Sequence, residues 1–125
     1  MTFDDLKKVP LIYLASPYSK YPTGLEMAFR DVSALAGKLL AAGLKVYSPI
    51  AHTHPIATYS NLDPYDHAIW LPFDAAIMDK ADVLLVAHME TWDKSFGISH
   101  EIEVFRAAGK PVLHLDPEKL ELIDG

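Results

Sequence analysis

The sequence predicts an α/β fold, a three-layer α/β/α sandwich around a parallel sheet of four to five strands, of the Rossmann or flavodoxin-like type. Short apolar runs alternate with longer amphipathic segments in the order β-α-β-α-β-α-β, and the connections between them are compact. This alternation is typical of a parallel sheet that is covered by helices on both faces through right-handed crossovers. At 125 residues, we expect one domain spanning residues 1–125.

The first half of the chain contains two predicted strands and one predicted helix. Residues 9–15 are an apolar run that a Ser-Pro turn ends, and residues 44–47 are a second short apolar run. Between them, residues 24–42 place apolar side chains three and four positions apart, which indicates an amphipathic helix that Gly43 ends. Residues 49–62 contain two prolines and no clear period, so we expect a functional loop there.

The predicted middle helix begins at Asp63 as N-cap and Pro64 as first helical residue. Its expected core face consists of Ile69, Phe73, Ala76 and Ile77. Further on we expect a buried strand at residues 83–87, a loop, a helix at residues 97–108, a strand at residues 111–115 and a polar tail. The expected inward side chains of that last helix are Ile98, Ile102 and Phe105.

Composition excludes several function classes. Eleven basic against seventeen acidic residues give a net charge of -6, which argues against nucleic-acid or anionic-membrane partners. The absence of cysteine excludes disulfides and thiolate metal sites. The N-terminus does not have the apolar core of a signal peptide, and no apolar stretch approaches the length of a membrane span. We therefore expect a cytoplasmic protein.

Ligands of open α/β sheets bind beyond the carboxyl ends of the strands, so residues 15–23, 48–62 and 87–101 are expected to line the site. Ser95 and Gly97 stand where the last helix begins, and exposed N–H groups there favour an anion. Glu101 follows on the same helix, beside its buried stripe, as a half-sheltered carboxylate. The alternative is that Ser95 only caps the helix and Glu101 only favours its positive end.

Trp70 and Asp74 lie four residues apart and share one face of the middle helix. In a functional interpretation Asp74 holds a sugar hydroxyl and Trp70 forms a wall of a base pocket. The alternatives are that Asp74 accepts a hydrogen bond from a backbone turn and that Trp70 is an ordinary core or interface aromatic.

Two further groups of residues are candidates for ligand contacts. His52 and His54 point the same way if their segment is extended, and with nearby carboxylates they could bind zinc. We favour a ligand contact by His54 and expect no metal site. In the first turn, Ser16 and Tyr18 are candidate binding residues, and Arg30 could reach a phosphate or a carboxylate, the alternative being a solvated arginine.

These residues resemble the nucleoside 2-deoxyribosyltransferase superfamily, including the deoxynucleoside 5′-monophosphate N-glycosidases. More narrowly, the chain resembles a subgroup of small bacterial and phage proteins of unassigned function (DUF1937-like). The resemblance covers residues 12–115 and is most specific at Asp74, at Ala81-Asp82 before a strand, and at Ser95-x-Gly97-x-x-x-Glu101. The sequence departs from the monophosphate enzymes at Ser19, where their first loop has arginine, and Arg30 is the candidate substitute.

The resemblance implies that Glu101 is the nucleophile, that Asp74 contacts the sugar and assists catalysis, and that Ser95 binds a 5′-phosphate. It implies cleavage of the N-glycosidic bond of a (deoxy)nucleoside or its 5′-monophosphate, by hydrolysis or base exchange, without a cofactor. A homo-oligomer, a dimer or tetramer, is also expected by analogy. The alternatives are a non-catalytic nucleotide-binding or sensor protein of the same fold, and a metal hydrolase that uses His52 and His54.

Overall fold

The computed structural model describes residues 1–123 and confirms the predicted α/β class. Five strands form one sheet in the order β2-β1-β3-β4-β5. The strands are β1 (Ile12–Ala15), β2 (Val46–Tyr47), β3 (Val83–Ala87), β4 (Val112–Asp116) and β5 (Glu121–Ile123). The first four are parallel, and β5 pairs with β4 in the antiparallel direction. The sheet is thus mixed, because the tail that we expected to be only polar turns back and adds a strand.

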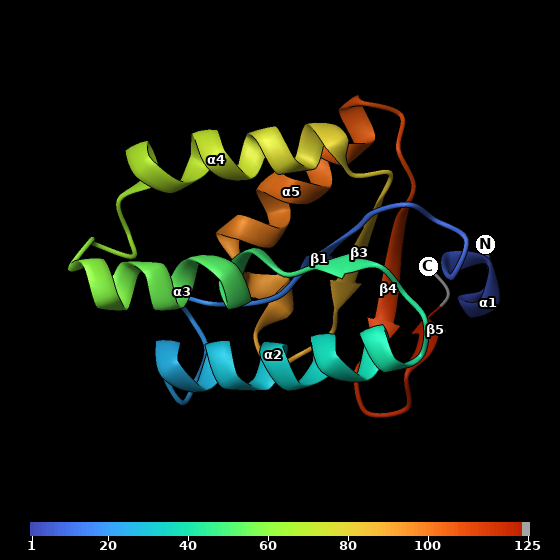
Figure 1. Cartoon of the computed structure of the whole chain (residues 1–125), viewed down its shortest axis with the longest axis horizontal. Coiled ribbons are helices and arrows are strands. Elements are labelled where there is room, and N and C mark those ends of the chain that lie inside the picture. Colours follow the sequence, from blue (N-terminus) through green and yellow to red (C-terminus); the bar gives the residue numbers. More distant parts are fainter. Residues whose placement is uncertain (124–125) are drawn as a thin grey trace.

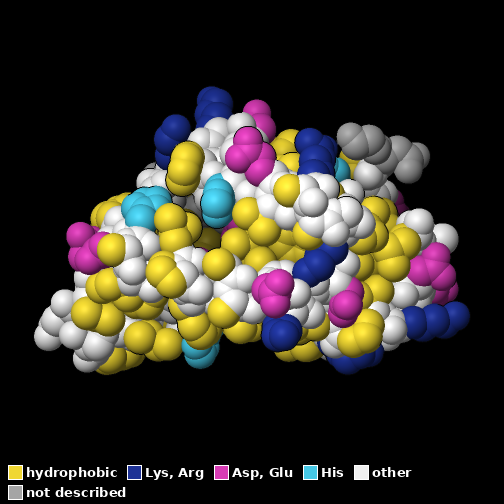
Figure 2. Space-filling model, turned by 90° about the horizontal axis from the view of Figure 1, so that it is seen from above, with side chains coloured by type: hydrophobic (Ala, Val, Ile, Leu, Met, Phe, Trp, Pro, Cys, Tyr) yellow, Lys and Arg dark blue, Asp and Glu magenta, His cyan; other side chains and the backbone are white. Residues whose placement is uncertain are grey.

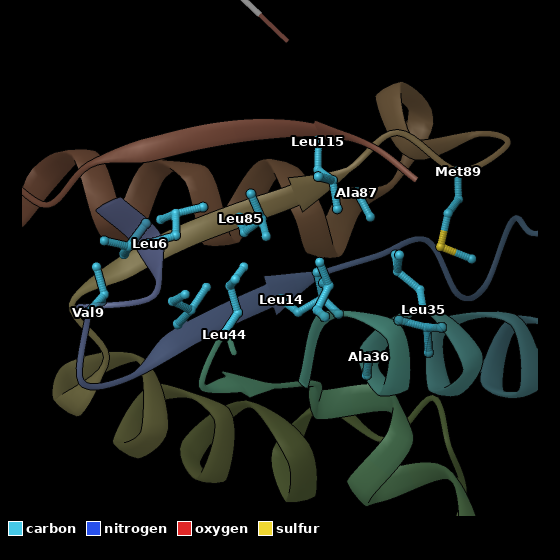
Figure 3. Packing of buried hydrophobic residues seen from close by; sticks show 14 of the residues in the cluster. Leu6, Val9, Leu14, Leu35, Ala36, Leu44, Leu85, Ala87, Met89 and Leu115 are labelled. Atoms are coloured by element: carbon cyan, nitrogen blue, oxygen red, sulfur yellow. The ribbon is translucent and has the colours of Figure 1, made fainter. Parts of the chain in front are cut away.

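One face of the sheet packs against α2 (Leu25–Ala41) and the short helix α1 (Phe3–Leu6), which the sequence did not predict. Figure 3 shows this core, to which β1 contributes Leu14, β3 contributes Leu85 and α2 contributes Leu35. Leu6 of α1 is completely buried in the same cluster. Burying this much apolar side-chain area is the main stabilising contribution to the fold.

The opposite face packs against α4 (His67–Lys80) and α5 (Phe96–Ala107), so the sheet lies between two helical layers (Figure 1). Because side chains alternate along a strand, Tyr13 points to this face while Leu14 points to the other. Ile98 and Phe105 of α5 are buried against it as predicted, and Met78 comes from α4. The two helices of this layer are the ones that carry Asp74 and Glu101.

The segment at residues 49–62 is not a loop, as we expected, but mostly a helix, α3 (Pro49–Ser60). Ser48 caps it by accepting a hydrogen bond from the Ala51 N–H at 3.1 Å, and Pro49 occupies the first turn, where a missing N–H costs nothing. Pro55 lies inside the helix and removes one of its hydrogen bonds. Packing of α3 against α2 and β1 outweighs this loss, which local sequence patterns do not reveal.

Helix α4 begins later than predicted and turns a different face inward. Its N-cap is Asp66, whose carboxylate accepts a hydrogen bond from the Ala68 N–H at 3.1 Å, whereas Asp63 forms a turn before it.

The core face of α4 also differs from the predicted one. The predicted core residues Ile69 and Phe73 are 38 % and 39 % exposed, and Ala76 is also exposed. The inward face consists instead of Trp70, Leu71, Asp74, Ile77 and Met78. The helix therefore turns its tryptophan and aspartate inward together with three of its apolar side chains, and leaves Ile69 and Phe73 outside.

The strand order places a crevice between β1 and β3. The chain leaves β1 for β2 on one side and then crosses through α3 and α4 to β3 on the other side. In doubly wound sheets this reversal leaves a gap at the carboxyl ends of the two strands, where ligands bind. None of the helices within residues 1–123 has the length and apolar character needed to traverse a lipid bilayer.

Candidate functional site

A cavity of about 630 Å³ opens at this crevice, a size typical of small-molecule sites. Its wall is formed by the turn after β1, by α3, by α4 with the turn before it, and by the first part of α5. Figure 2, which views the molecule from the side of α4, shows a hollow with histidine and apolar side chains at its rim. The three segments predicted to line the site all contribute to it. Helix α4 adds a fourth wall.

Glu101 lies on the cavity wall contributed by α5. Removal of its carboxyl group from water raises the pKa of Glu101 to about 8. The hydroxyl of Tyr13, which approaches without regular hydrogen-bond geometry, opposes this rise, and the charge of Asp74 adds to it. At neutral pH the free protein therefore holds a proton on a carboxyl group that faces an open cavity.

Asp74 lies on the α4 side of the same cavity. Burial raises the pKa of Asp74 to about 6. In addition to burial, the charge of Asp74 raises the pKa values of both Glu101 and Tyr47, so the three groups form one electrostatically coupled cluster. Two carboxyl groups whose pKa values are pushed above their usual range and apart from one another are typical of sites that move protons or form covalent intermediates.

Within residues 1–123, four buried side-chain polar atoms have no hydrogen-bond partner, and all four belong to this region. They are the hydroxyl oxygens of Tyr13, Ser16 and Tyr47 and one carboxyl oxygen of Asp74. Ser16 and Asp74 line the cavity, and the two tyrosines interact electrostatically with Asp74. A buried polar atom without a partner costs about 1–3 kcal/mol, so the fold bears an unusual concentration of this cost beside the cavity, which is typical of functional sites.

Ser95 and Gly97 lie at the start of α5, as predicted, and both line the cavity. Ser95 is 8 % exposed, and its hydroxyl oxygen accepts a hydrogen bond from the Ile98 N–H at 3.2 Å. The helix-cap interpretation of Ser95 is thus correct, but a hydroxyl that accepts one bond still has a proton to donate to a ligand. A side chain at Gly97 would meet no protein atom closer than 3.8 Å, so the packing of the protein does not require glycine here.

Tyr18 lines the cavity, but His54 stands behind it and does not. The Tyr18 hydroxyl is 2.6 Å from His54 Nδ1, and His54 Nε2 is 2.8 Å from a carboxylate oxygen of Glu26. The His54 ring also stacks on Phe29 at 4.7 Å between centroids. The expected direct ligand contact of His54 is therefore wrong, because both of its nitrogens already have protein partners.

The structure also corrects the predictions for Arg30 and for the histidine pair. Arg30 is exposed on α2, pairs with Glu26 at 3.3 Å and does not reach the cavity. His52 and His54 do not share a direction, because two residues on a helix lie on opposite sides of it. The His52 ring stacks on Phe73 at 5.5 Å, away from His54. The arrangement that a zinc site on these two histidines would need is absent.

Trp70 lines the cavity as predicted, and its indole N–H donates to the carbonyl of Asp63 at 2.8 Å. Sequence reasoning missed Tyr13 and Tyr47, whose phenols surround the two carboxyl groups. A signal was present, since a phenol within an apolar strand needs a partner for its hydroxyl. It also assigned no ligand contact to His67 or His100, which line the cavity near Phe96.

The fold and the site define an α/β protein with a small-molecule cavity at the switch point of a doubly wound sheet. The chain belongs to the family DUF1937, described as a domain of unknown function, which matches residues 10–116. The match spans every strand from β1 to β4 and every element of the cavity wall. A comparison with curated proteins finds no match.

Proposed function

We propose that the protein cleaves the N-glycosidic bond of a nucleoside or a nucleoside 5′-monophosphate, with Glu101 as the nucleophile. The observation that carries this proposal is the pair of carboxyl groups, Glu101 and Asp74, in one cavity among buried hydroxyl groups that have no partner. The spacing Ser95-x-Gly97-x-x-x-Glu101 and the position of Asp74 support it through their resemblance to the nucleoside 2-deoxyribosyltransferase superfamily. Hydrolysis and base exchange differ only in whether water or a second base accepts the sugar.

The chemistry matches the groups in the cavity. Breaking an N-glycosidic bond builds positive charge on the sugar, and a carboxylate below the anomeric carbon stabilises that charge and then bonds to the carbon. Glu101 must first lose its proton to solvent, and the positive charge that develops on the sugar and the Tyr13 hydroxyl both favour the ionised form. Asp74, ionised at neutral pH, accepts a hydrogen bond from a sugar hydroxyl through the part of its carboxylate that lines the cavity.

The direct test is a panel of nucleosides and 5′-monophosphates, with release of free base followed by chromatography. We expect base to be released from at least one compound, without added metal, at a rate proportional to protein concentration. Binding of an intact nucleotide with no base released from any compound would contradict the proposal. It would favour instead a nucleotide-binding protein without turnover.

Ser95 gives a prediction about the 5′-phosphate. No lysine or arginine within residues 1–123 lines the cavity, so a phosphate there depends on Ser95 and the N–H groups at the start of α5. Ser95→Ala is expected to lower kcat/KM for monophosphates about tenfold more than for nucleosides, and to destabilise the fold by about 1 kcal/mol through loss of the cap.

Ser95→Asp is the matched control for the cap, because aspartate caps a helix as well as serine does but repels a phosphate. We expect this variant to keep the unfolding temperature of the original protein and still to lose its preference for monophosphates. Equal loss on nucleosides and monophosphates in both variants would show that Ser95 acts only as a helix cap.

A further inference from the structure

Tyr18, His54 and Glu26 form a hydrogen-bonded chain that the proposed chemistry of Glu101 and Asp74 does not use. It runs from the cavity wall at Tyr18, through the buried ring of His54, to the exposed carboxylate of Glu26. The two contacts measure 2.6 Å and 2.8 Å, and the side chain of His54 is only 10 % exposed. A histidine held this firmly at both nitrogens is oriented toward Tyr18 and has no freedom to turn away.

We propose that this chain is the acid that protonates the departing base, with Tyr18 as the group that touches it and His54 and Glu26 as positioning residues. The inference rests on the proposed function, since it names the proton donor for the same reaction.

The direction of the hydrogen bonds follows from the chemistry of the three groups. Hydrogen bonding to His54 lowers the pKa of Glu26, so Glu26 is a carboxylate, which can only accept, and Nε2–H of His54 donates to it. When His54 is an imidazolium, Nδ1–H donates to the Tyr18 oxygen, and the Tyr18 O–H is free to donate into the cavity. Burial raises the pKa of Tyr18 to about 12, so its phenol keeps its proton until an acceptor arrives.

The position of Tyr18 also suits a donor to the leaving group. Tyr18 packs with the core on the α2 face of the sheet, whereas Glu101 and Asp74 come from helices on the other face. A nucleophile attacks the anomeric carbon from the side opposite the bond that breaks. A base that departs away from Glu101 therefore departs toward the wall that carries Tyr18.

The step balances without any further reactant. As the C–N bond breaks, its electron pair goes to the base, and the Tyr18 O–H proton passes to a base nitrogen or oxygen. The Nδ1–H proton of the His54 imidazolium moves to the Tyr18 oxygen and restores the phenol. His54 is left neutral, with Nε2–H still on Glu26, and regains the proton that water or the second base releases when it takes the sugar from Glu101.

The test compares the rates at which two kinds of base are released, one that must be protonated in order to leave and one that leaves readily without protonation. For a purine substrate the pair is N7-methylguanine, which leaves as a neutral molecule without protonation, and guanine, which needs a proton. For a pyrimidine substrate the pair is 5-fluorouracil, which is the better leaving group, and uracil. Tyr18→Phe removes only the hydroxyl and is expected to slow release of the ordinary base about 100-fold, within the usual range for general acids. Release of the methylated base should fall less than about fivefold, and the fluorinated pair should show the same trend.

His54→Gln and Glu26→Gln extend the test along the chain. Both should slow release of the ordinary base more than release of the better leaving group, with a smaller effect for Glu26→Gln. Glu26 is exposed, so this substitution should leave the fold intact. Tyr59→Phe, at a tyrosine that is 88 % exposed and away from the cavity, is the matched control and should change neither rate.

Equal slowing of both leaving groups by Tyr18→Phe, or no slowing of either, would overturn the assignment of the acid while leaving the glycosidase proposal intact. Absence of base release from every compound with the original protein would instead remove the proposed function itself, and this inference with it.

Discussion

Glu101→Gln is expected to lower base release by roughly 10³-fold or more, because an amide cannot form the covalent bond to the sugar. Glutamine keeps the volume and most hydrogen bonds of glutamate, so the cavity should stay intact. Glu101→Ala should abolish base release as well, with the fold retained. The rates are measured by chromatography of the free base under single-turnover conditions.

Glu103→Gln is the matched control for this prediction. Glu103 lies on the same helix and is exposed, so the substitution makes the same change of charge outside the cavity. It should retain the original rate. Full activity in Glu101→Gln and Glu101→Ala would show that another group attacks the sugar or that the chemistry is different.

Glu101→Gln is also expected to stabilise the fold at high pH. Burial raises the pKa of Glu101 from 4.5 to about 8 in the folded protein, so between these values the folded chain holds a proton that the unfolded chain has lost. The free energy of unfolding of the original protein therefore falls as pH rises from about 4.5 to 8. Glutamine has no such proton, so the stability gain of Glu101→Gln should be near zero at pH 4.5 and largest above pH 8.

The expected gain above pH 8 is on the order of 5 kcal/mol, or roughly 20 °C in unfolding temperature. Thermal unfolding followed by circular dichroism across this range measures it. Glu103→Gln should show little change at any pH. Parallel curves for the original protein and Glu101→Gln would mean that the carboxyl group is solvated, and the argument from its burial would fail.

The sequence predicted most of the framework because the two central strands, β1 and β3, are buried on both faces and read as apolar runs. The strand at residues 83–87 has the predicted bounds, and Ile98 and Phe105 face the core as expected. The position of the cavity followed from the predicted strand order alone, because ligands of open α/β sheets bind beyond the carboxyl ends of the strands. Ser16, Tyr18, Trp70, Asp74, Ser95, Gly97 and Glu101 all line it.

The errors arise where tertiary packing overrides local signals. Pro55 indicated a loop, but α3 tolerates it because the helix is capped by Ser48 and packed against α2. The periodicity of the middle helix predicted that Ile69 and Phe73 face the core, but in the structure they are exposed and Asp74 faces the cavity. Contacts between distant segments, such as the one between Tyr18 and His54, have no local signature at all.

The central claim is that Glu101 bonds to the anomeric carbon, and mass spectrometry of the trapped protein tests it most directly. A substrate from the panel, made with fluorine at C2′ of its sugar, should react and then stall, because fluorine slows breakdown of the sugar–enzyme bond. The account predicts a mass increase equal to the fluorinated sugar, located on the peptide that contains Glu101 and absent from Glu101→Gln. Base release from an unlabelled protein, or a label on another residue, would contradict it.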